Sequence, residues 1–276
     1  MYRVTDKKDL NFEDYYLEVE APHVTRNWRP GQFVMIMAHE RGERIPMSIH
    51  RIIGNRIGMF IRRHGKTTYY IYENIRVGDS LYAVAGPLGR PLEIKPYGTA
   101  VVASDAVCAH AEHYEIAREL KKAGNEVISI MSFPSVNAFY PEEFLPTKIS
   151  DEIYFTTFDG SNGVKGNYIP VLKRLVNERK IDAVYAGGSF FGMRQVGELA
   201  TKYRFEARTL VRQIMVDGTG MCGSCRIRHG ERIVFVCRDG PWLDPALVDW
   251  DDVERRDARF RHQQKLALDA YLSSSR

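Results

Sequence analysis

Three of the four cysteines of this chain lie within one short stretch, VDGTGMCGSCRIRHGERIVFVC, at residues 216–237. Two residues separate Cys222 from Cys225, and eleven residues separate Cys225 from Cys237. Glycines interleave the first two cysteines, so the backbone can bend tightly there. Closely spaced thiols in a glycine-rich loop predict a metal centre, and the loop must fold around it.

The spacing identifies a candidate for the fourth ligand. Asp217 lies five residues before Cys222, so Asp217, Cys222, Cys225 and Cys237 reproduce C-x4-C-x2-C followed by a distant cysteine, with aspartate in the first position. That spacing is typical of plant-type [2Fe-2S] sites. Small residues let the loop wrap closely and direct backbone N–H groups at the cluster sulfurs. The sequence therefore predicts a [2Fe-2S] cluster held by one carboxylate and three thiolates.

A zinc site is the alternative, because three cysteines and His229 would make a Cys3His set. His229 falls in the expected turn of a hairpin over RIRHGERIVFVC, which would direct it away from the cysteines. Cys108 stands apart in an apolar segment, and we interpret it as a buried small hydrophobe.

Composition narrows the class of protein. The chain has 276 residues and 44% hydrophobic content, enough for two modest domains and an appendage. Its 39 Lys and Arg against 35 Asp and Glu leave a formal charge of +4, too small and scattered for a nucleic-acid footprint. No stretch approaches the length of a membrane span and none resembles a signal peptide. With few cysteines for a disulfide framework, we expect a cytoplasmic protein.

The pattern along the chain changes near residue 97. Residues 1–96 contain short alternating runs such as QFVMIMA and RIGMFIRR between glycine turns, which predict a small antiparallel barrel. Residues 97–212 alternate buried strands with amphipathic helices and predict a parallel α/β domain. The cysteine region follows at 213–250, and residues 251–276 predict a charged helical tail.

Taken in order, RPGQFVMIM, ERIPMSI, HGKTT, GPLGRPLEI and VDGTGMCGSC resemble the iron–sulfur flavoprotein subunits of the ferredoxin–NADP reductase superfamily. Similar families are the small subunits of NADH-dependent ferredoxin:NADP oxidoreductase (sulfide dehydrogenase) and the electron-transfer subunits of dihydroorotate dehydrogenase. The resemblance covers nearly the whole chain, and Asp in place of the first cysteine is specific to the first of these.

The resemblance implies that the barrel binds FAD. Strand residues near the flavin ring and pyrophosphate would come from RIPMSI, and a phosphate-binding helix N-terminus from HGKTT. A nucleotide-triphosphate P-loop is excluded for GKTT, because Phe60 stands where the motif requires glycine. Ile45 departs from the arginine that the wider superfamily carries, and neighbouring Arg44 can substitute for it. The implied FAD-binding residues are Arg44, Pro46, Met47, Ser48, Gly65, Lys66, Thr67 and Thr68.

The α/β domain departs further from the family. Where relatives carry a glycine-rich turn for a dinucleotide pyrophosphate, this chain reads SDAVCAHAEHYEIA, with Asp105, His110 and His113. The later turn, AGGSFFGMRQV, keeps its two glycines but adds Phe190 and Phe191. We interpret the NAD(P)H pocket as degenerate and nicotinamide binding as doubtful.

The resulting hypothesis is an electron-transfer subunit that passes electrons between FAD and a [2Fe-2S] cluster within a multisubunit oxidoreductase. A larger catalytic or electron-accepting subunit is the expected partner, with ferredoxin a further candidate. No residue pattern demands a nucleophile or a general acid–base pair. Two alternatives stay open: a self-sufficient NAD(P)H-dependent reductase, and a zinc-stabilised assembly protein without redox chemistry.

Overall fold

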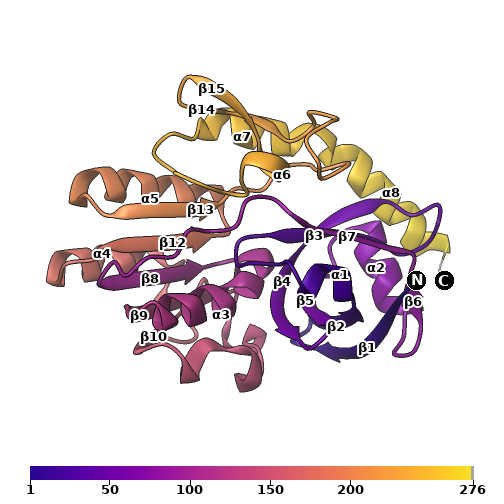
Figure 1. The fold of residues 1–276 in the computed structure, drawn as a ribbon, viewed down its shortest axis with the longest axis horizontal. Helices are drawn as coiled ribbons and strands as arrows, with labels where there is room; N and C mark the ends of the chain where they lie inside the picture. Colours follow the sequence, from indigo (N-terminus) through magenta and orange to yellow (C-terminus); the bar gives the residue numbers. More distant parts are fainter. Residues whose placement is uncertain (275–276) are drawn as a thin grey trace.

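Seven antiparallel strands in the first third of the chain curl into a barrel-like sheet (Figure 1). Their order is β6-β1-β2-β5-β4-β3-β7. Gly54, at φ +60°, lies in the two-residue turn that joins β4 to β5, a position that favours glycine. The strands are β1 (Tyr2–Asp9), β2 (Asp14–Glu20), β3 (Phe33–Met37), β4 (Arg44–Ile53), β5 (Arg56–Arg62), β6 (Ser80–Leu81) and β7 (Ala83–Leu88), with α1 (Pro22–Thr25) and α2 (Lys66–Asn74) between them.

A second sheet of seven strands follows, in the order β11-β10-β9-β8-β12-β13-β16. All of its pairings are parallel except that of β13 with β16. Its strands are β8 (Thr99–Ser104), β9 (Glu126–Phe133), β10 (Glu152–Thr157), β11 (Val164–Lys165), β12 (Ala183–Gly187), β13 (Glu206–Leu210) and β16 (Trp242–Leu243). Short 3-10 turns η1 (Val136–Ala138), η2 (Glu142–Phe144) and η3 (Pro146–Lys148) lie between β9 and β10.

Helices cover both faces of the parallel sheet. α3 (Val107–Lys122) packs on one face through Ile116 and Leu120. α4 (Ile169–Glu178) and α5 (Phe190–Tyr203) pack on the other face. β8 lies between β9 and β12, so the strand order reverses direction there, and such a switch point is where open α/β sheets bind ligands.

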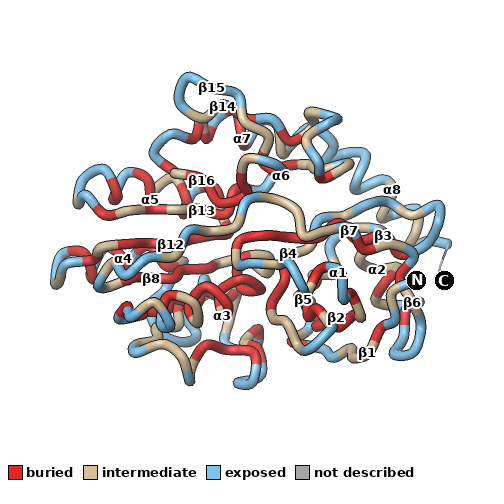
Figure 2. The backbone as a smooth tube through the Cα atoms, in the orientation of Figure 1, coloured by how far each residue is buried: buried red, intermediate tan, exposed pale blue. Residues whose placement is uncertain are grey.

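The barrel and the α/β part are joined by a buried aromatic cluster. Tyr16 and Phe60 of the barrel pack with Phe133 and Tyr140 of the α/β part. The Tyr140 hydroxyl also donates to the buried Asp14 carboxylate at 2.7 Å. Figure 2 shows buried backbone continuing from the barrel strands into α3. This contact fixes how the two parts face each other.

The last quarter of the chain forms the cysteine region and the tail. A hairpin of β14 (Arg226–His229) and β15 (Arg232–Phe235) leads into α6 (Val236–Asp239) and β16. The sequence predicts a helical tail. In the structure this tail consists of three consecutive elements, α7 (Trp250–Asp257), η4 (Ala258–Phe260) and α8 (Arg261–Ser274). The computed structural model describes residues 1–274, and within them no helix is long and apolar enough to cross a membrane.

The tail returns to the barrel. Figure 1 shows α8 running from the cysteine region toward α2, close to the N-terminus. The Tyr271 hydroxyl of α8 donates to Glu73 of α2 at 2.7 Å. The tail therefore connects the cysteine region with the barrel a second time.

Candidate functional site

The loop of Asp217 and Cys222 is shaped by backbone hydrogen bonds to the Asp217 carboxylate. That carboxylate accepts the N–H groups of Thr219 at 2.7 Å, Gly220 at 3.2 Å and Cys222 at 2.7 Å. These bonds lower the pKa of Asp217 and keep it ionised, and the bond from the Thr219 N–H has the largest effect. Gly218, at φ +80°, takes a conformation that L residues rarely adopt.

The four predicted cluster ligands lie in two pairs. Asp217 contacts the Cys222 backbone, and the sulfur atoms of Cys225 and Cys237 are 3.3 Å apart. Cys225 and Cys237 are buried, whereas Cys222 is exposed. Burial raises the pKa of the Cys237 thiol to about 12, so its thiolate form needs a bound cation.

The donor set fits a binuclear cluster better than a single ion. Across residues 1–274, no group of three or more His, Cys, Asp or Glu side chains is placed to hold one metal ion. A structural zinc needs four ligands at one point, whereas a [2Fe-2S] cluster takes two protein ligands on each iron. His229 does not complete a zinc set, because its Nε2 lies 3.2 Å from the Asp244 carbonyl oxygen.

The segment that holds Arg44, Pro46, Met47 and Ser48 is the first half of β4. It pairs with β3 along its whole length, Phe33 opposite Ser48 and Met35 opposite Pro46. Its other edge pairs with β5 only from Ile49 onward. Backbone groups before Ile49 are therefore free of a second strand, as a flavin ring edge would require.

The HGKTT segment starts α2, as predicted. Gly65 is the N-cap, and Thr68 Oγ1 accepts the N–H groups of His64 at 3.0 Å and Gly65 at 3.1 Å. The Thr67 hydroxyl donates to the Glu43 carboxylate, next to Arg44. The Glu43 carboxylate therefore lies at the N-terminus of α2, and helix N-termini also bind phosphate groups. The fold brings the two predicted FAD segments together, and their chemistry fits a pyrophosphate.

The cysteine loop rests on the same part of the barrel. A Cβ atom on Gly218 would lie 2.6 Å from Met35 Cγ and 2.9 Å from Leu88 Cδ1, so only glycine allows this approach. Met35 is the β3 residue opposite Pro46. Cys225 and Cys237 belong to the same buried cluster as Phe33 and Met35. The candidate cluster site and the candidate flavin strand are therefore neighbours.

The ends of the neighbouring strands β8 and β12 are bridged by two side chains. Asp105, just after β8, accepts the backbone N–H and the hydroxyl of Ser189, each at 2.6 Å. Ser189 is the N-cap of α5. A Cβ atom on Gly188 would lie 1.6 Å from Asp105 Oδ1, so the carboxylate fills this space. Burial raises the pKa of Asp105.

His110 and His113, which replace small residues of the expected glycine-rich turn, are buried side chains of α3. Nδ1 of His113 is 2.8 Å from Ser104 Oγ, and its Nε2 is 2.8 Å from Ser129 Oγ. Burial lowers the pKa of His113 to about 3 and that of His110 to about 4, so both rings are neutral near pH 7. Cys108, expected to be buried, is half-buried.

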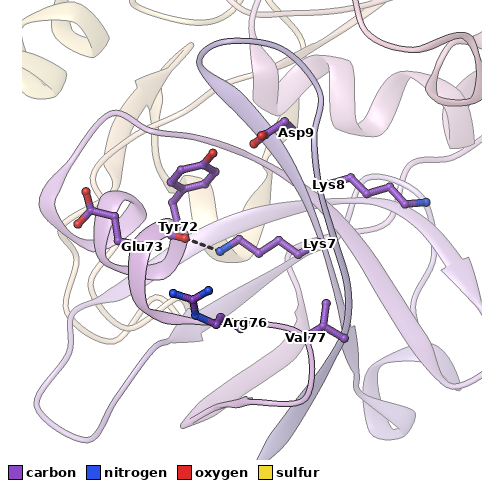
Figure 3. A pocket seen from close by; sticks show the side chains of 7 residues that line it. All are labelled: Lys7, Lys8, Asp9, Tyr72, Glu73, Arg76 and Val77. Carbon is purple, nitrogen blue, oxygen red and sulfur yellow. Dashed lines mark hydrogen bonds between the residues drawn. The ribbon is translucent and has the colours of Figure 1, made fainter.

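Two surface cavities lie away from all predicted site residues. One, of about 580 Å³, is lined by charged side chains that include Lys7, Asp9 and Arg76 (Figure 3). Figure 3 shows the Lys7 ammonium directed at the Tyr72 carbonyl, and it also donates to the carbonyls of Ile71 and Ile75. Lys7 thus caps the C-terminus of α2. The other cavity lies beside α4.

The cysteine region matches a known domain. A model of the iron–sulfur cluster binding domain of dihydroorotate dehydrogenase B matches residues 212–249. A relative from Thermotoga maritima, a dihydroorotate dehydrogenase B (NAD(+)) electron transfer subunit homolog, is 35% identical over 260 residues, 93% of this chain and 90% of the relative. The chain belongs to the dihydroorotate dehydrogenase B electron transfer subunit family.

Other members are more distant in sequence. The dihydroorotate dehydrogenase B (NAD(+)) electron transfer subunit of Enterococcus faecalis (strain V583) is 28% identical over 261 residues, 90% of this chain and 97% of the relative. Family membership confirms the predicted resemblance, the class of function as an oxidoreductase electron-transfer subunit, and the iron–sulfur centre.

Solved structures confirm the predicted fold class. A structure of an NADH-dependent reduced ferredoxin-NADP oxidoreductase, solved in a study of flavin-based electron bifurcation, matches with a TM-score of 0.91 and 34% identity, over 99% of this chain and 98% of that chain. The ferredoxin reductase of carbazole 1,9a-dioxygenase matches with a TM-score of 0.63 and 15% identity, over 75% of this chain and 67% of that chain, and shares the fold.

Two features of the site were missed from the sequence. One is Ser189 as the partner of Asp105, which lies 84 residues away. The other is Glu112, a buried carboxyl that accepts the Ser48 hydroxyl at 2.6 Å. The sequence offers no clear signal for it, because the buried face of α3 also carries His110, His113 and Glu115.

Proposed function

We propose that this chain passes electrons between FAD on the barrel and a [2Fe-2S] cluster in the cysteine loop, as one subunit of a larger oxidoreductase. A flavin exchanges electrons in pairs or singly and the cluster exchanges one at a time, so together they connect a two-electron donor to a one-electron chain. Residues 1–96 carry FAD, 97–212 are a scaffold, 213–250 hold the cluster and 251–276 form the tail.

The contact of Gly218 with Met35 carries this proposal. It places the loop of Asp217 directly on β3, beside the half of β4 that contains Ser48. In this assignment Asp217, Cys222, Cys225 and Cys237 ligate the cluster. Ser48 and its strand neighbours Pro46 and Met47 meet the ring, while the FAD pyrophosphate takes the place of Glu43 at α2, near Arg44, Gly65, Lys66, Thr67 and Thr68.

Nicotinamide does not enter the α/β crevice in this proposal. A dinucleotide pyrophosphate needs a helix N-terminus and close backbone approach, and Asp105 already occupies the N-terminus of α5. Asp105 is fixed by two bonds from Ser189 and would repel a second anion, whereas the exposed Glu43 side chain is held by one bond and can turn away from a phosphate. Phe191, at the start of α5, is exposed, whereas Phe190 is buried. The names of the relatives mention NAD(+) and NADH, which supports the self-sufficient reductase as the second candidate.

The proposed partner is a protein subunit that docks over the cluster loop. Met221 is 90% exposed beside exposed Cys222, and Phe260 of the tail is also exposed. Arg259 anchors the tail to this loop by donating to the Ser224 carbonyl at 2.9 Å. Exposed arginines lie in or beside the loop at positions 226, 238 and 259. An acidic, electron-accepting surface fits this charge.

Anaerobic purification of the chain with its bound subunits tests the proposal. We expect FAD, iron and sulfide in the ratio of one flavin to one [2Fe-2S] cluster per chain, and a co-purifying larger subunit. Preparations that contain zinc but neither iron nor flavin would refute the redox assignment. If flavin and cluster are present but no subunit co-purifies, electron transfer between FAD and the cluster stands, and the proposal of a larger complex is refuted.

A further inference from the structure

The Glu112 carboxyl lies where three parts of the chain meet. It projects from α3, and its Oε1 accepts the hydroxyl of Ser48 on β4 at 2.6 Å. Its Oε2 accepts the indole N–H of Trp242 on β16 at 2.7 Å. Only 1% of Glu112 is exposed, and among the described residues its recorded partners are the neutral donors Ser48 and Trp242. The barrel, the α/β part and the cysteine region therefore share one buried carboxyl.

Burial without a cation favours the neutral form of this group. An ionised carboxylate loses its hydration in a buried site, and two hydrogen bonds from neutral donors compensate only in part. Burial accordingly raises the pKa of Glu112 to about 7, although the bonds from Ser48 and Trp242 act in the opposite direction. Near neutral pH the group can hold a proton or release it.

The two oxygens of this carboxyl are not equivalent. The Trp242 indole N–H is only a donor, so Oε2 must remain an acceptor in both forms. The proton of the neutral form therefore belongs on Oε1, facing Ser48 Oγ. A hydroxyl can donate or accept, so Ser48 donates to the ionised form and accepts from the neutral form. The geometry gives the proton one direction of exit, through Ser48.

We propose that Glu112 is a positioning residue for proton transfer, which exchanges a proton with the flavin site through the Ser48 hydroxyl. The inference rests on the proposed function, which places FAD at Ser48. Two-electron reduction of a flavin is accompanied by uptake of one proton near neutral pH, and the [2Fe-2S] cluster carries electrons only. The proton must therefore return to a group of the protein or to water when the electrons leave.

The transfer balances without a further reagent. Glu112 releases the proton from Oε1 to Ser48 Oγ, and Ser48 passes its own hydroxyl proton to the flavin site, so the hydroxyl is unchanged and Glu112 becomes a carboxylate. The two electrons come from the two-electron donor of the complex and leave singly through the cluster. The reverse transfer restores the neutral carboxyl.

The neighbours of Glu112 with a shifted pKa differ from it in their protonation near pH 7 or in their ion pairing. His50, beside it on β4, has a pKa held well below its usual value by burial, and His113 and His110 are neutral. Burial raises the pKa of the Cys108 thiol, one turn earlier. Glu115, one turn later, has a pKa raised to about 7 by burial but pairs with Arg118. The elements packed on α3 further carry Arg44 and Arg51 on β4, Arg56 and Arg62 on β5, Glu126 on β9, Tyr185 on β12 and Lys148 in η3.

Glu115 supplies a matched control, because it is a second buried carboxyl on α3 that does not contact Ser48 or Trp242. The experiment compares wild type, Glu112→Gln, Ser48→Ala and Glu115→Gln in the full chain with its bound subunits. Infrared pH titration of the flavin-free chain first detects the protonated carboxyl band. We expect a band that is lost as pH rises through about 7, and Glu112→Gln and Glu115→Gln should each remove part of it, because both carboxyls have a pKa raised to about 7.

The loaded complex then gives the functional readout. In wild type we expect a break near pH 7 in the plot of the flavin reduction rate against pH, with the rate falling as Glu112 loses its proton, and a solvent isotope effect on that rate. Glu112→Gln and Ser48→Ala should both lose the break and slow reduction at least tenfold, whereas Glu115→Gln keeps both features. Glu112→Asp should restore part of the rate.

Each outcome decides between the inference and a simpler role. If Glu112→Gln binds FAD and keeps the break and the rate, the inference is wrong while the proposed function stands. If Glu115→Gln behaves like Glu112→Gln, the effect belongs to any buried carboxyl of α3 and the relay through Ser48 is wrong. Wild-type chain without flavin would overturn the proposed function and the inference together, although the infrared band would still report the state of Glu112.

Discussion

Asp105 and Ser189 are joined by two hydrogen bonds of 2.6 Å, one from the Ser189 backbone N–H and one from its hydroxyl. They come from the ends of β8 and β12, the neighbouring strands at which the sheet order reverses. This bridge ties the first strand of the α/β part to the N-terminus of α5. The N-terminus of α5 is therefore occupied by a side chain of the protein itself.

Asp105→Ala should destabilise the fold through loss of this bridge. Each hydrogen bond to a charged group is worth about 1.5–3 kcal/mol, so we expect a loss of about 3 kcal/mol in the free energy of unfolding. Asp159→Ala is the control, because Asp159 makes the same pair of bonds to Ser161 at an exposed site. Urea denaturation measures both. Equal losses in the two variants would mean that the buried bridge contributes no more to the free energy of unfolding than an exposed pair of hydrogen bonds.

The isolated, flavin-loaded chain should not be reduced by NADH or NADPH. Loss of two backbone contacts to a pyrophosphate, each of about 1.5–3 kcal/mol, weakens binding by roughly a hundredfold or more. Stopped-flow absorbance of the flavin at micromolar nicotinamide measures this directly. Rapid bleaching of the wild-type flavin would support the self-sufficient reductase instead.

The cluster ligands predict a specific pattern among single variants. Cys222→Ala, Cys225→Ala and Cys237→Ala should each lose the [2Fe-2S] centre, while Asp217→Cys keeps it at a shifted potential, because thiolates are its usual ligands. Cys108→Ala is the control, since Cys108 lies on α3, and it should keep the full spectrum. Visible absorption, electron paramagnetic resonance and iron content measure this. An unchanged spectrum and potential in Asp217→Ala would exclude Asp217 as a ligand.

Flavin retention should depend on the first turn of α2. Thr68→Ala removes the acceptor for the N–H groups of His64 and Gly65, and loss of such a cap costs about 1 kcal/mol. Ser48 and Thr67 together would contact the ring and pyrophosphate in the proposal, so the double alanine variant should retain less FAD than Thr68→Ala. Thr201→Ala, which alters a hydroxyl that bonds only within α5, is the control. Equilibrium dialysis gives the affinities, and full retention by the double variant would contradict the flavin assignment.

Local patterns predicted much of this molecule, because they depend on residues close in sequence. The glycine loop with Asp217 and Cys222 and the start of α2 at Gly65 follow from turn and capping chemistry that spans only a few positions. The sequence pattern of the tail does not reveal η4, the 3-10 turn between α7 and α8 from which Arg259 donates to the Ser224 carbonyl. Contacts across the chain were not predictable: Glu112 meets Trp242 over 130 residues, and only the folded sheet order brings them together.

The buried histidine of α3 predicts how stability changes with pH. Burial lowers the pKa of His113 from 6.5 to about 3, so the unfolded chain binds more protons than the folded chain between these values. Stability must therefore fall as pH falls below about 6.5. His113→Gln keeps a polar group between Ser104 and Ser129 but cannot titrate.

Between pH 7 and pH 4, the free energy of unfolding of His113→Gln should rise by about 3 kcal/mol relative to that of wild type, at 1.36 kcal/mol per pKa unit. This relative gain does not depend on how much stability the variant loses at pH 7. Urea denaturation at each pH gives the difference, and parallel curves for wild type and His113→Gln would mean that the pKa of His113 does not change on folding.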